Sequence, residues 1–137
     1  MKQDNDTTFS LMFELGRLIR SRMEKSAPLL PIAQFETLRF VYDKVRPNMR
    51  DIAKHLQVSA PSATALVDEL NRAQYLHRQP DTKDRRQVRL AMTEKGSRML
   101  LKSIAQRKRV LRSVLSPLSH NDQHELNRIL TKITARS

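Results

Sequence analysis

The sequence predicts a mainly α-helical fold with one small β-hairpin. Only 2 of the 137 residues are glycine, and apolar residues recur at helical spacing over most of the chain. The stretch QPDTKDRRQVRL at 79–90 then joins a charged turn to an alternating strand. A chain of this length suits one domain with one modest core, so we predict a single domain over 1–137.

Two helices are expected in the first third of the chain. The first runs from Thr7 or Thr8 to about Ser26, and its apolar stripe is broader than packing on one neighbour requires, which indicates two buried faces. Pro28 and Pro31 then break the helical pattern, because proline does not fit inside a helix. A second helix follows, and its expected buried residues are Phe35, Leu38, Val41, Tyr42 and Val45.

Residues 49–76 carry a helix-turn-helix pattern. A short amphipathic helix is followed by a three-residue turn and a second helix, for which Ser59 is a good N-cap and Pro61 is tolerated in the first turn. Ala53 is small enough for the two helices to cross closely, and Val58 is expected to fill the gap between them. The second helix is expected to bury Ala63, Leu66, Val67 and Leu70.

The remaining chain predicts a hairpin and two more helices. Strands are expected at 75–79 and 87–92, and Thr93 can cap the long helix that follows them. Ser119 and Asp122 stand at the spacing of a capping box, which predicts the start of a last helix. The apolar stripe of that helix consists of Leu126, Ile129, Leu130 and Ile133.

The distribution of charge predicts a polyanionic partner. The formal net charge is +12, and residues 76–112 hold 12 basic and 3 acidic side chains, which gives a net charge of +9. Nucleic acid and an anionic membrane surface both fit this charge. No apolar run approaches the roughly 18 residues of a membrane span, and the N-terminal MKQDNDTTF lacks the apolar centre of a signal peptide. We therefore expect a soluble, cytoplasmic protein.

Catalysis and metal binding are not expected. The chain has no cysteine, so disulfides and cysteine zinc sites are excluded. His120 and His124 stand at the i, i+4 spacing of a metal-binding pair, but an exposed polar face is the favoured explanation for them. The sequence contains no nucleotide-hydrolysis motif and no nucleophile elbow. We predict no enzymatic activity, no metal and no cofactor.

Three motifs carry a family resemblance. They are the triplet Asp84-Arg85-Arg86 at the hairpin tip, T-E-K-G at 93–96 and the LS…L..IL..I pattern of the last helix. With the helix-turn-helix before them, they resemble the MarR family of winged helix-turn-helix transcriptional regulators over nearly the whole chain. The resemblance implies that 47–93 is the DNA-binding unit, and that 7–46 and 94–137 are mainly N- and C-terminal dimerisation helices.

The same resemblance implies the partners. It predicts a homodimeric repressor of a pseudo-palindromic operator in double-stranded DNA, relieved by a small aromatic or anionic effector, with no membrane partner. Each recognition helix would enter a major groove, and each hairpin, or wing, the adjacent minor groove. The implied dimer interface comprises Phe9, Leu11, Phe13, Leu15, Leu118, Leu126, Ile129, Leu130 and Ile133.

The predicted DNA contacts lie on the wing and around the recognition helix. Arg86 is expected in the minor groove, where the negative potential is strongest, with Asp84 fixing its direction. The stretch 60–71 has no lysine or arginine, which favours an A·T-rich site read through shape and thymine methyl groups. The other predicted contacts are Arg50, Lys54, Ser59, Ala60, Pro61, Ser62, Thr64, Lys83 and Arg85.

Two departures from the family pattern affect the backbone rather than the DNA contacts. Gln57 and Gln74 stand where family members often have glycine. A left-handed conformation at either position would cost about 1 kcal/mol.

Two other functions remain open from the sequence. The chain could bind nucleic acid non-specifically as an architectural winged-helix protein, because such binding needs charge but no base readout. It could also be a partner-binding module that kept the fold and lost DNA binding.

Overall fold

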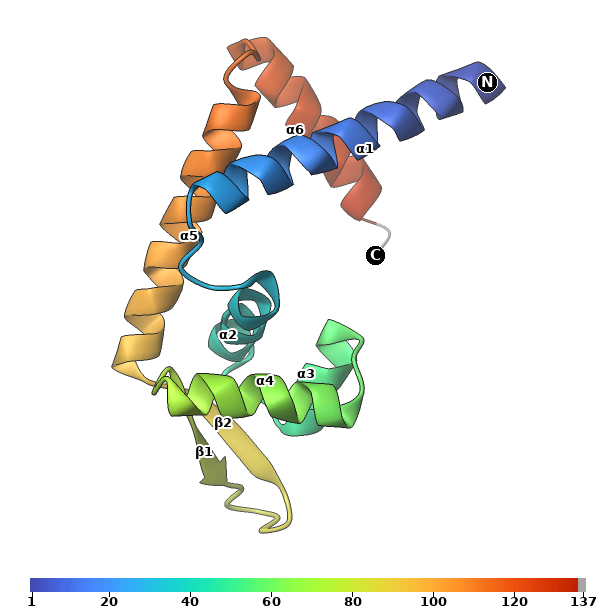
Figure 1. Ribbon diagram of the computed structural model, residues 1–137. Helices are drawn as coiled ribbons and strands as arrows, with labels where there is room; N and C mark the ends of the chain where they lie inside the picture. The colour runs from blue at the N-terminus through green and yellow to red at the C-terminus, as the bar shows by residue number, and fades with distance from the viewer. Residues whose placement is uncertain (136–137) are drawn as a thin grey trace. The chain divides into compact units, whose positions relative to one another are not determined.

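The computed structural model describes residues 1–135 and has the predicted fold class, six helices and one antiparallel hairpin in that range (Figure 1). The helices of the first half are α1 (Lys2–Lys25), α2 (Ile32–Lys44), α3 (Met49–Leu56) and α4 (Ala60–Arg72). The second half contains β1 (Leu76–Pro80), β2 (Val88–Met92), α5 (Glu94–Leu115) and α6 (His120–Thr134). None of the helices in 1–135 is long and apolar enough to cross a membrane.

The described chain forms two compact units. One contains 1–27 together with the chain from 106 onward, and the other contains 28–105. The segments 28–46 and 94–105 belong to the same compact unit as the hairpin.

The hydrophobic core lies in the 28–105 unit. It draws side chains from the loop before α2, from α2 to α4, from both strands and from the first half of α5. Full burial of each large aliphatic side chain stabilises the fold by about 1.5–3 kcal/mol. The buried residues of this core are Leu30, Phe35, Leu38, Val41, Ile52, Ala63, Val67, Leu70, Leu76, Leu90 and Leu100.

The buried face of α2 differs from the prediction at two residues. Tyr42 is 56% exposed and Val45 is 73% exposed. The buried face includes Thr37, whose hydroxyl donates to the carbonyl of Ala33 (2.7 Å) and so satisfies its polar atom within the helix. Val45 lies beyond the end of α2 with φ at 50°, so it leaves the helical repeat that predicted its burial.

Helix α1 begins earlier than predicted. It starts at Lys2 instead of Thr7 or Thr8. The hydroxyls of these threonines donate to the carbonyls of Gln3 and Asp4, one turn back, as threonines inside a helix do. They therefore do not cap the helix, and the polar residues before them continue it.

The helix-turn-helix forms with α3 and α4. The predicted cap is present, because the Ser59 hydroxyl accepts from the N–H of Ser62 (3.2 Å). The expected role of Val58 was wrong, since this side chain is 37% exposed. Its backbone N–H donates to the carbonyl of Ala53 (3.1 Å), so the main chain closes the turn.

Two helices of this unit end on left-handed glutamines. Gln57 after α3 has φ of 54°, and Gln74 after α4 has φ of 63°. The N–H of Gln74 donates to Asn71 and that of Tyr75 to Leu70 (both 3.0 Å), the bond pattern of a Schellman ending, where glycine is usual. The left-handed conformation of Gln57 and Gln74 therefore costs about 1 kcal/mol of folding free energy at each position.

The hairpin is short and joined to a third chain segment. Leu76 pairs with Met92 at its base and Pro80 with Val88 near its tip. On the other edge of β2, the N–H of Leu90 donates to the carbonyl of Pro47 (2.9 Å). This bond ties the hairpin to the segment that leads into α3.

The first turn of α5 is fastened to the corner between α4 and β1. Thr93 caps α5 by accepting from the N–H of Gly96 (2.9 Å), and its hydroxyl donates to the carbonyl of Gln74 (2.6 Å). The Lys95 ammonium donates to the carbonyl of Ala73 (3.0 Å). A Cβ at residue 96 would lie 1.9 Å from the carbonyl oxygen of Tyr75, so only glycine fits. Thr93, Lys95 and Gly96 of the T-E-K-G motif thus allow α5 to pack against this corner.

Gly96→Ala is expected to destabilise the protein by about 3 kcal/mol or more, because the added methyl group meets backbone that has to shift. Gly16→Ala is the matched control. No atom lies within 4 Å of a Cβ at that position, so it should leave stability unchanged or raise it by about 0.5–1 kcal/mol. Urea unfolding of both variants measures the difference, and similar effects of the two would contradict this account.

Candidate nucleic-acid interface

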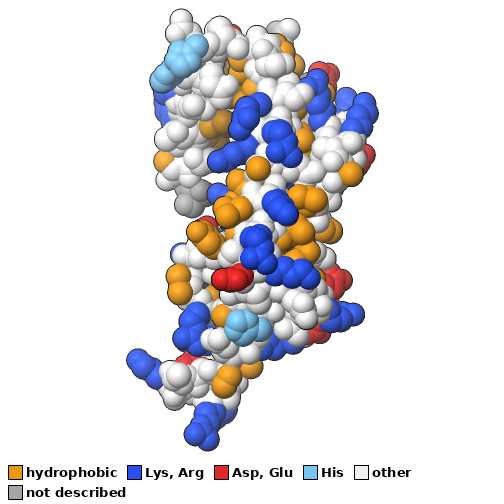
Figure 2. Space-filling view, turned by 90° about the vertical axis from the view of Figure 1, so that its left-hand side faces the viewer, with side chains coloured by type: hydrophobic (Ala, Val, Ile, Leu, Met, Phe, Trp, Pro, Cys, Tyr) orange, Lys and Arg blue, Asp and Glu red, His pale blue; other side chains and the backbone are white. Residues whose placement is uncertain are grey.

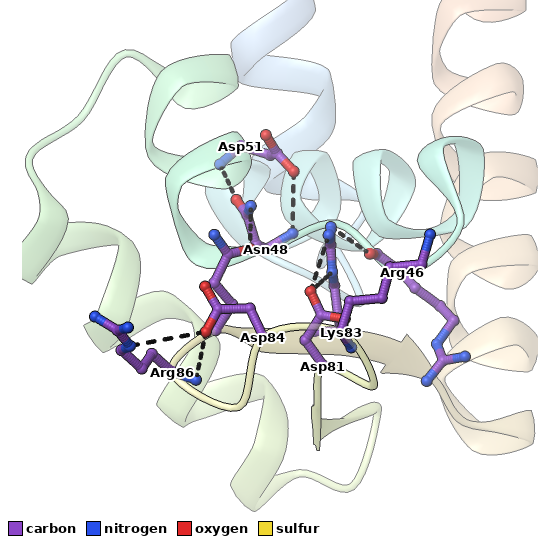
Figure 3. A network of polar contacts seen from close by, with 9 residues as sticks. Arg46, Asn48, Asp51, Asp81, Lys83, Asp84 and Arg86 are labelled. Atoms are coloured by element: carbon purple, nitrogen blue, oxygen red, sulfur yellow. Dashed lines mark hydrogen bonds and ion pairs between the residues drawn. The ribbon is translucent and has the colours of Figure 1, made fainter.

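The hairpin tip is shaped by two aspartates that accept bonds from their own turn. The carboxylate of Asp81 accepts from the N–H of Lys83 (3.0 Å), and that of Asp84 accepts from the N–H of Arg86 (3.1 Å) (Figure 3). The Arg86 side chain is 96% exposed, and its Nε lies 4.0 Å from the Asp84 carboxylate. Asp84 therefore acts mainly on the backbone of Arg86 and leaves the guanidinium in solvent.

Asp81 also anchors the tip to the body of the hairpin. Its carboxylate pairs with the guanidinium of Arg89 on β2 (3.2 Å), and the same guanidinium donates to the carbonyl of Arg46 (3.4 Å). The bond from Lys83 and the charge of Arg89 hold the pKa of Asp81 below its ordinary value. This anchor was missed from the sequence, where Asp81 was only one charge of a turn.

Lysine and arginine side chains gather at the hairpin tip. Figure 2 shows them at the lower end of the molecule, where Figure 1 draws the hairpin. Lys83 and Arg85 are exposed, and their side chains have no polar partner within residues 1–135. Their positive charge is therefore fully available to an anionic partner.

The start of α4 presents small and hydroxyl side chains. Ser59, Ala60, Pro61, Ser62 and Thr64 are all exposed. The Ser59 and Ser62 hydroxyls lie 3.0 Å apart, so this first turn offers exposed hydroxyl oxygens and methyl groups without a cation.

The two acidic residues of α4 are bonded to neighbouring elements. Asp68 forms an ion pair with Arg78 on β1, and Glu69 accepts from the side-chain amide of Gln34 on α2 (2.8 Å). The charge of Asp68 is therefore paired with a cation, and the Glu69 carboxylate is held toward α2.

The two cations predicted on α3 face different surroundings. Arg50 shares a hollow of about 230 Å³ with Arg86 and the return of the hairpin. Lys54 lines another cavity, beside Phe40 and His55. Arg50 thus adjoins the hairpin tip, whereas Lys54 lies apart from it. The α3 N-terminus itself is capped by Asn48, which exchanges backbone and side-chain bonds with Asp51.

The unit built from α1, α6 and the second half of α5 exposes many large apolar side chains. Phe9 is 68% exposed and Phe13 is 63% exposed. In the described chain, neither α1 nor α6 buries any side chain fully. Of the other residues implied for the dimer interface, Leu126 is partly buried, and Leu11, Leu15, Leu118, Ile129, Leu130 and Ile133 are exposed.

The histidine pair on α6 does not gather further ligands. The rings of His120 and His124 meet edge to face, with centroids 5.0 Å apart. Over residues 1–135 no group of three or more histidine or acidic side chains is placed to hold a metal ion. Asp122 instead completes the predicted capping box with Ser119.

Comparison with known proteins gives a family match for part of the chain. Residues 30–88, which span α2 to the start of β2, match the MarR family. The helix-turn-helix segment of this chain is therefore similar to that of MarR family proteins. The computed structure is similar to that of a MarR family protein from Bacillus stearothermophilus, with a TM-score of 0.86, 22% identity and coverage of 99% of this chain and 96% of that one.

Two further similar proteins carry names that describe a function or a bound partner. A transcriptional repressor of Escherichia coli, MprA, is 31% identical over 57% of this chain and 44% of its own length. A mutant of S. aureus MepR, bound to an oligodeoxyribonucleotide in its structure, has a TM-score of 0.63, 21% identity and coverage of 96% of each chain. The chain spans 44% to 64% of the length of the curated relatives that it matches.

Asp81→Asn is expected to weaken the anchor of the hairpin tip in a pH-dependent way. Since the pKa of Asp81 is lowered by folding, its stabilising contribution is complete above the unfolded pKa of about 3.9 and is lost as the pH falls through the lower folded value. The variant should be less stable than wild type at about pH 6 and approach it at about pH 3.

Urea unfolding at both pH values tests this expectation. The control is Asp43→Asn, which removes an exposed carboxylate of α2. A stability difference between Asp81→Asn and wild type that stays constant as the pH falls would argue against the anchor.

Proposed function

We propose that the chain is a double-stranded DNA-binding transcriptional regulator that acts as a homodimeric repressor. In this proposal, α4 enters the major groove and the wing carries Arg86 into the adjacent minor groove. The repressor role follows the name of the relative MprA, and the DNA partner follows the oligonucleotide complex of MepR.

One observation carries the DNA-binding proposal. An exposed guanidinium, that of Arg86, stands at the tip of a hairpin whose backbone is fixed by Asp84 and whose turn is tied to β2 through Asp81. A cation on a rigid projection loses little conformational freedom on entering a narrow groove of strong negative potential. Lys83 and Arg85 beside it are suited to phosphate oxygens.

The operator is proposed to be A·T-rich. The exposed start of α4 offers the methyl groups of Ala60 and Thr64 and the hydroxyls of Ser59 and Ser62, but no guanidinium to pair with guanine. Ala65 occupies the position at which many family members have arginine. Discrimination between DNA sequences would therefore rest on thymine methyl groups and on the shape of the minor groove.

A second copy of the chain is the proposed cover for the apolar faces of α1 and α6. Exposed apolar side chains on this scale are unusual on a monomer and favour an interface. A twofold-symmetric dimer would present two α4 helices to two half-sites, which is the reason to expect a pseudo-palindromic operator.

A small anionic effector is also part of the proposal. A cavity of about 500 Å³ between α1 and α5 is lined by Arg22, Lys25 and Arg109, and none of its lining residues is acidic. Arg22 donates to the hydroxyl of Ser113, which fixes one wall of the cavity. An anion bound there would release the operator.

Two rival functions make different predictions for the same binding experiment. Non-specific architectural binding requires equal affinity for any duplex and a steep salt dependence. A partner-binding module requires no duplex affinity at all. The concentration of exposed cations at the hairpin tip favours DNA binding over the second rival.

Arg86→Ala is expected to lower affinity for the operator by about ten- to hundredfold, because it removes the minor-groove cation. Fluorescence anisotropy measures this with the duplex upstream of the chain's own gene and a scrambled duplex, each at several salt concentrations. Wild type should prefer the upstream duplex by about a thousandfold or more.

Arg98→Ala is the matched control, because it removes an exposed guanidinium that pairs within α5, with Glu94. Its affinity should remain close to that of wild type. Equal wild-type affinity for both duplexes would support the architectural rival, and no affinity for either would support the partner-binding module.

Phe13→Asp is expected to convert the dimer to a monomer, because it places a charge in the proposed apolar interface. Sedimentation equilibrium gives the mass directly. Ser21→Asp adds the same charge on the polar stripe of α1 and should leave the dimer intact. A wild-type mass of one chain at micromolar concentration would refute the dimer.

A further inference from the structure

A second cavity lies within the 28–105 unit. It measures about 610 Å³ and is formed by the end of α2, the segment before α3, the exposed side of α3 and one residue of β2. This volume falls in the range of about 300–1,000 Å³ that is typical of small-ligand sites. It shares no lining residue with the hollow beside Arg86.

The charged residues of this cavity are unbalanced. Four cations line it, Lys44, Arg46, Lys54 and Arg89, against the single carboxylate of Asp51. That carboxylate already accepts the N–H of Asn48 (3.1 Å) in the cap of α3. The cavity therefore has a strong net positive charge.

Two of the four cations are already engaged with the wing. Arg89 pairs with Asp81 (3.2 Å), and the Arg46 guanidinium donates to the side chain of Gln79. Lys44 and Lys54 form no ion pair within residues 1–135. These two ammonium groups remain available to an anion, and each can donate several hydrogen bonds to it.

The remaining wall of the cavity is apolar and aromatic. Phe40, Val45 and Pro47 line it, together with His55. The rings of Phe40 and His55 are stacked, with centroids 4.2 Å apart and planes inclined by 17°. Such a wall offers contact area to a flat organic group beside the anion.

We propose that this cavity is a binding site for a small organic phosphate, a phosphomonoester carried on a planar ring. Lys44 and Lys54 hold the phosphate, and the ring lies on the wall that contains Phe40. A phosphomonoester carries close to two negative charges at neutral pH, so it offsets the four cations better than a carboxylate does.

The site has a physical connection to the wing. Arg46 and Arg89 line the cavity and also bond to residues of the hairpin. A phosphate that drew either guanidinium toward itself would compete with Gln79 or Asp81. A ligand in the cavity would thereby alter the anchoring of the hairpin. This ligand-binding role is separate from the proposed DNA-binding function.

The test is a calorimetric titration of the full chain with phenyl phosphate in the absence of DNA. Wild type should bind saturably, and Lys44→Gln should weaken binding at least tenfold. Lys102→Gln removes an exposed ammonium from α5 that lines no part of the cavity, and it should bind as wild type does. Inorganic phosphate and benzoate, which each lack one half of the ligand, should bind at least tenfold more weakly.

Several results would overturn the proposal. They are no saturable heat with wild type, equal losses in both lysine variants, or benzoate binding as tightly as phenyl phosphate. Thermal melts of the two variants separate a lost site from a lost fold. Absence of duplex binding would refute the proposed function and leave this titration unaffected.

DNA backbone phosphate is the competing source of the same chemistry. Lys44→Gln should therefore also be measured in the duplex anisotropy assay. Unchanged duplex affinity supports the free ligand. Weakened duplex affinity, together with no binding of phenyl phosphate by wild type, would assign the lysine to the DNA backbone.

Discussion

The contact on which the 28–105 unit depends most is the approach of Gly96 to the backbone of Tyr75. It allows the first turn of α5 to lie against the corner at which α4 ends and β1 begins. The Thr93 hydroxyl and the Lys95 ammonium then satisfy carbonyls at the end of α4, which a helix terminus leaves without partners. One short motif thus fixes the end of the recognition helix, the start of the wing and the start of α5.

Acidic and basic side chains are distributed differently over the elements of this unit. Helix α4 keeps its exposed start free of charge and bonds its acids, Asp68 and Glu69, to β1 and α2. The cations are concentrated on the hairpin, where Asp81 and Asp84 each order a turn and raise the rigidity of the tip. Asp81 and Asp84 lie near the exposed cations of the tip, but each carboxylate is bonded within the hairpin.

Features set by short-range rules could be predicted from the sequence, and features set by partners distant in sequence could not. The caps at Ser59 and Ser119, the two strands and the helix-turn-helix follow from local residue patterns, and they are present. The burial of Thr37 and the anchoring role of Asp81 depend on bonds that a hydrophobic pattern does not register. Arg50 and Lys54 line different hollows because of how α3 packs, which their spacing in the sequence does not reveal.

The hairpin also bears on how the protein avoids self-assembly through its sheet. Strand β2 is occupied on both edges, by β1 and by the segment at Pro47 and Asn48. Only β1 has an edge without a strand in the part of the chain that the structure describes. That edge is five residues long, ends at Pro80, which has no N–H to donate, and carries the charge of Arg78. A strand of this kind is a poor template for amyloid-like addition, so a protein that projects its hairpin into solvent can be present at high concentration without polymerising through it.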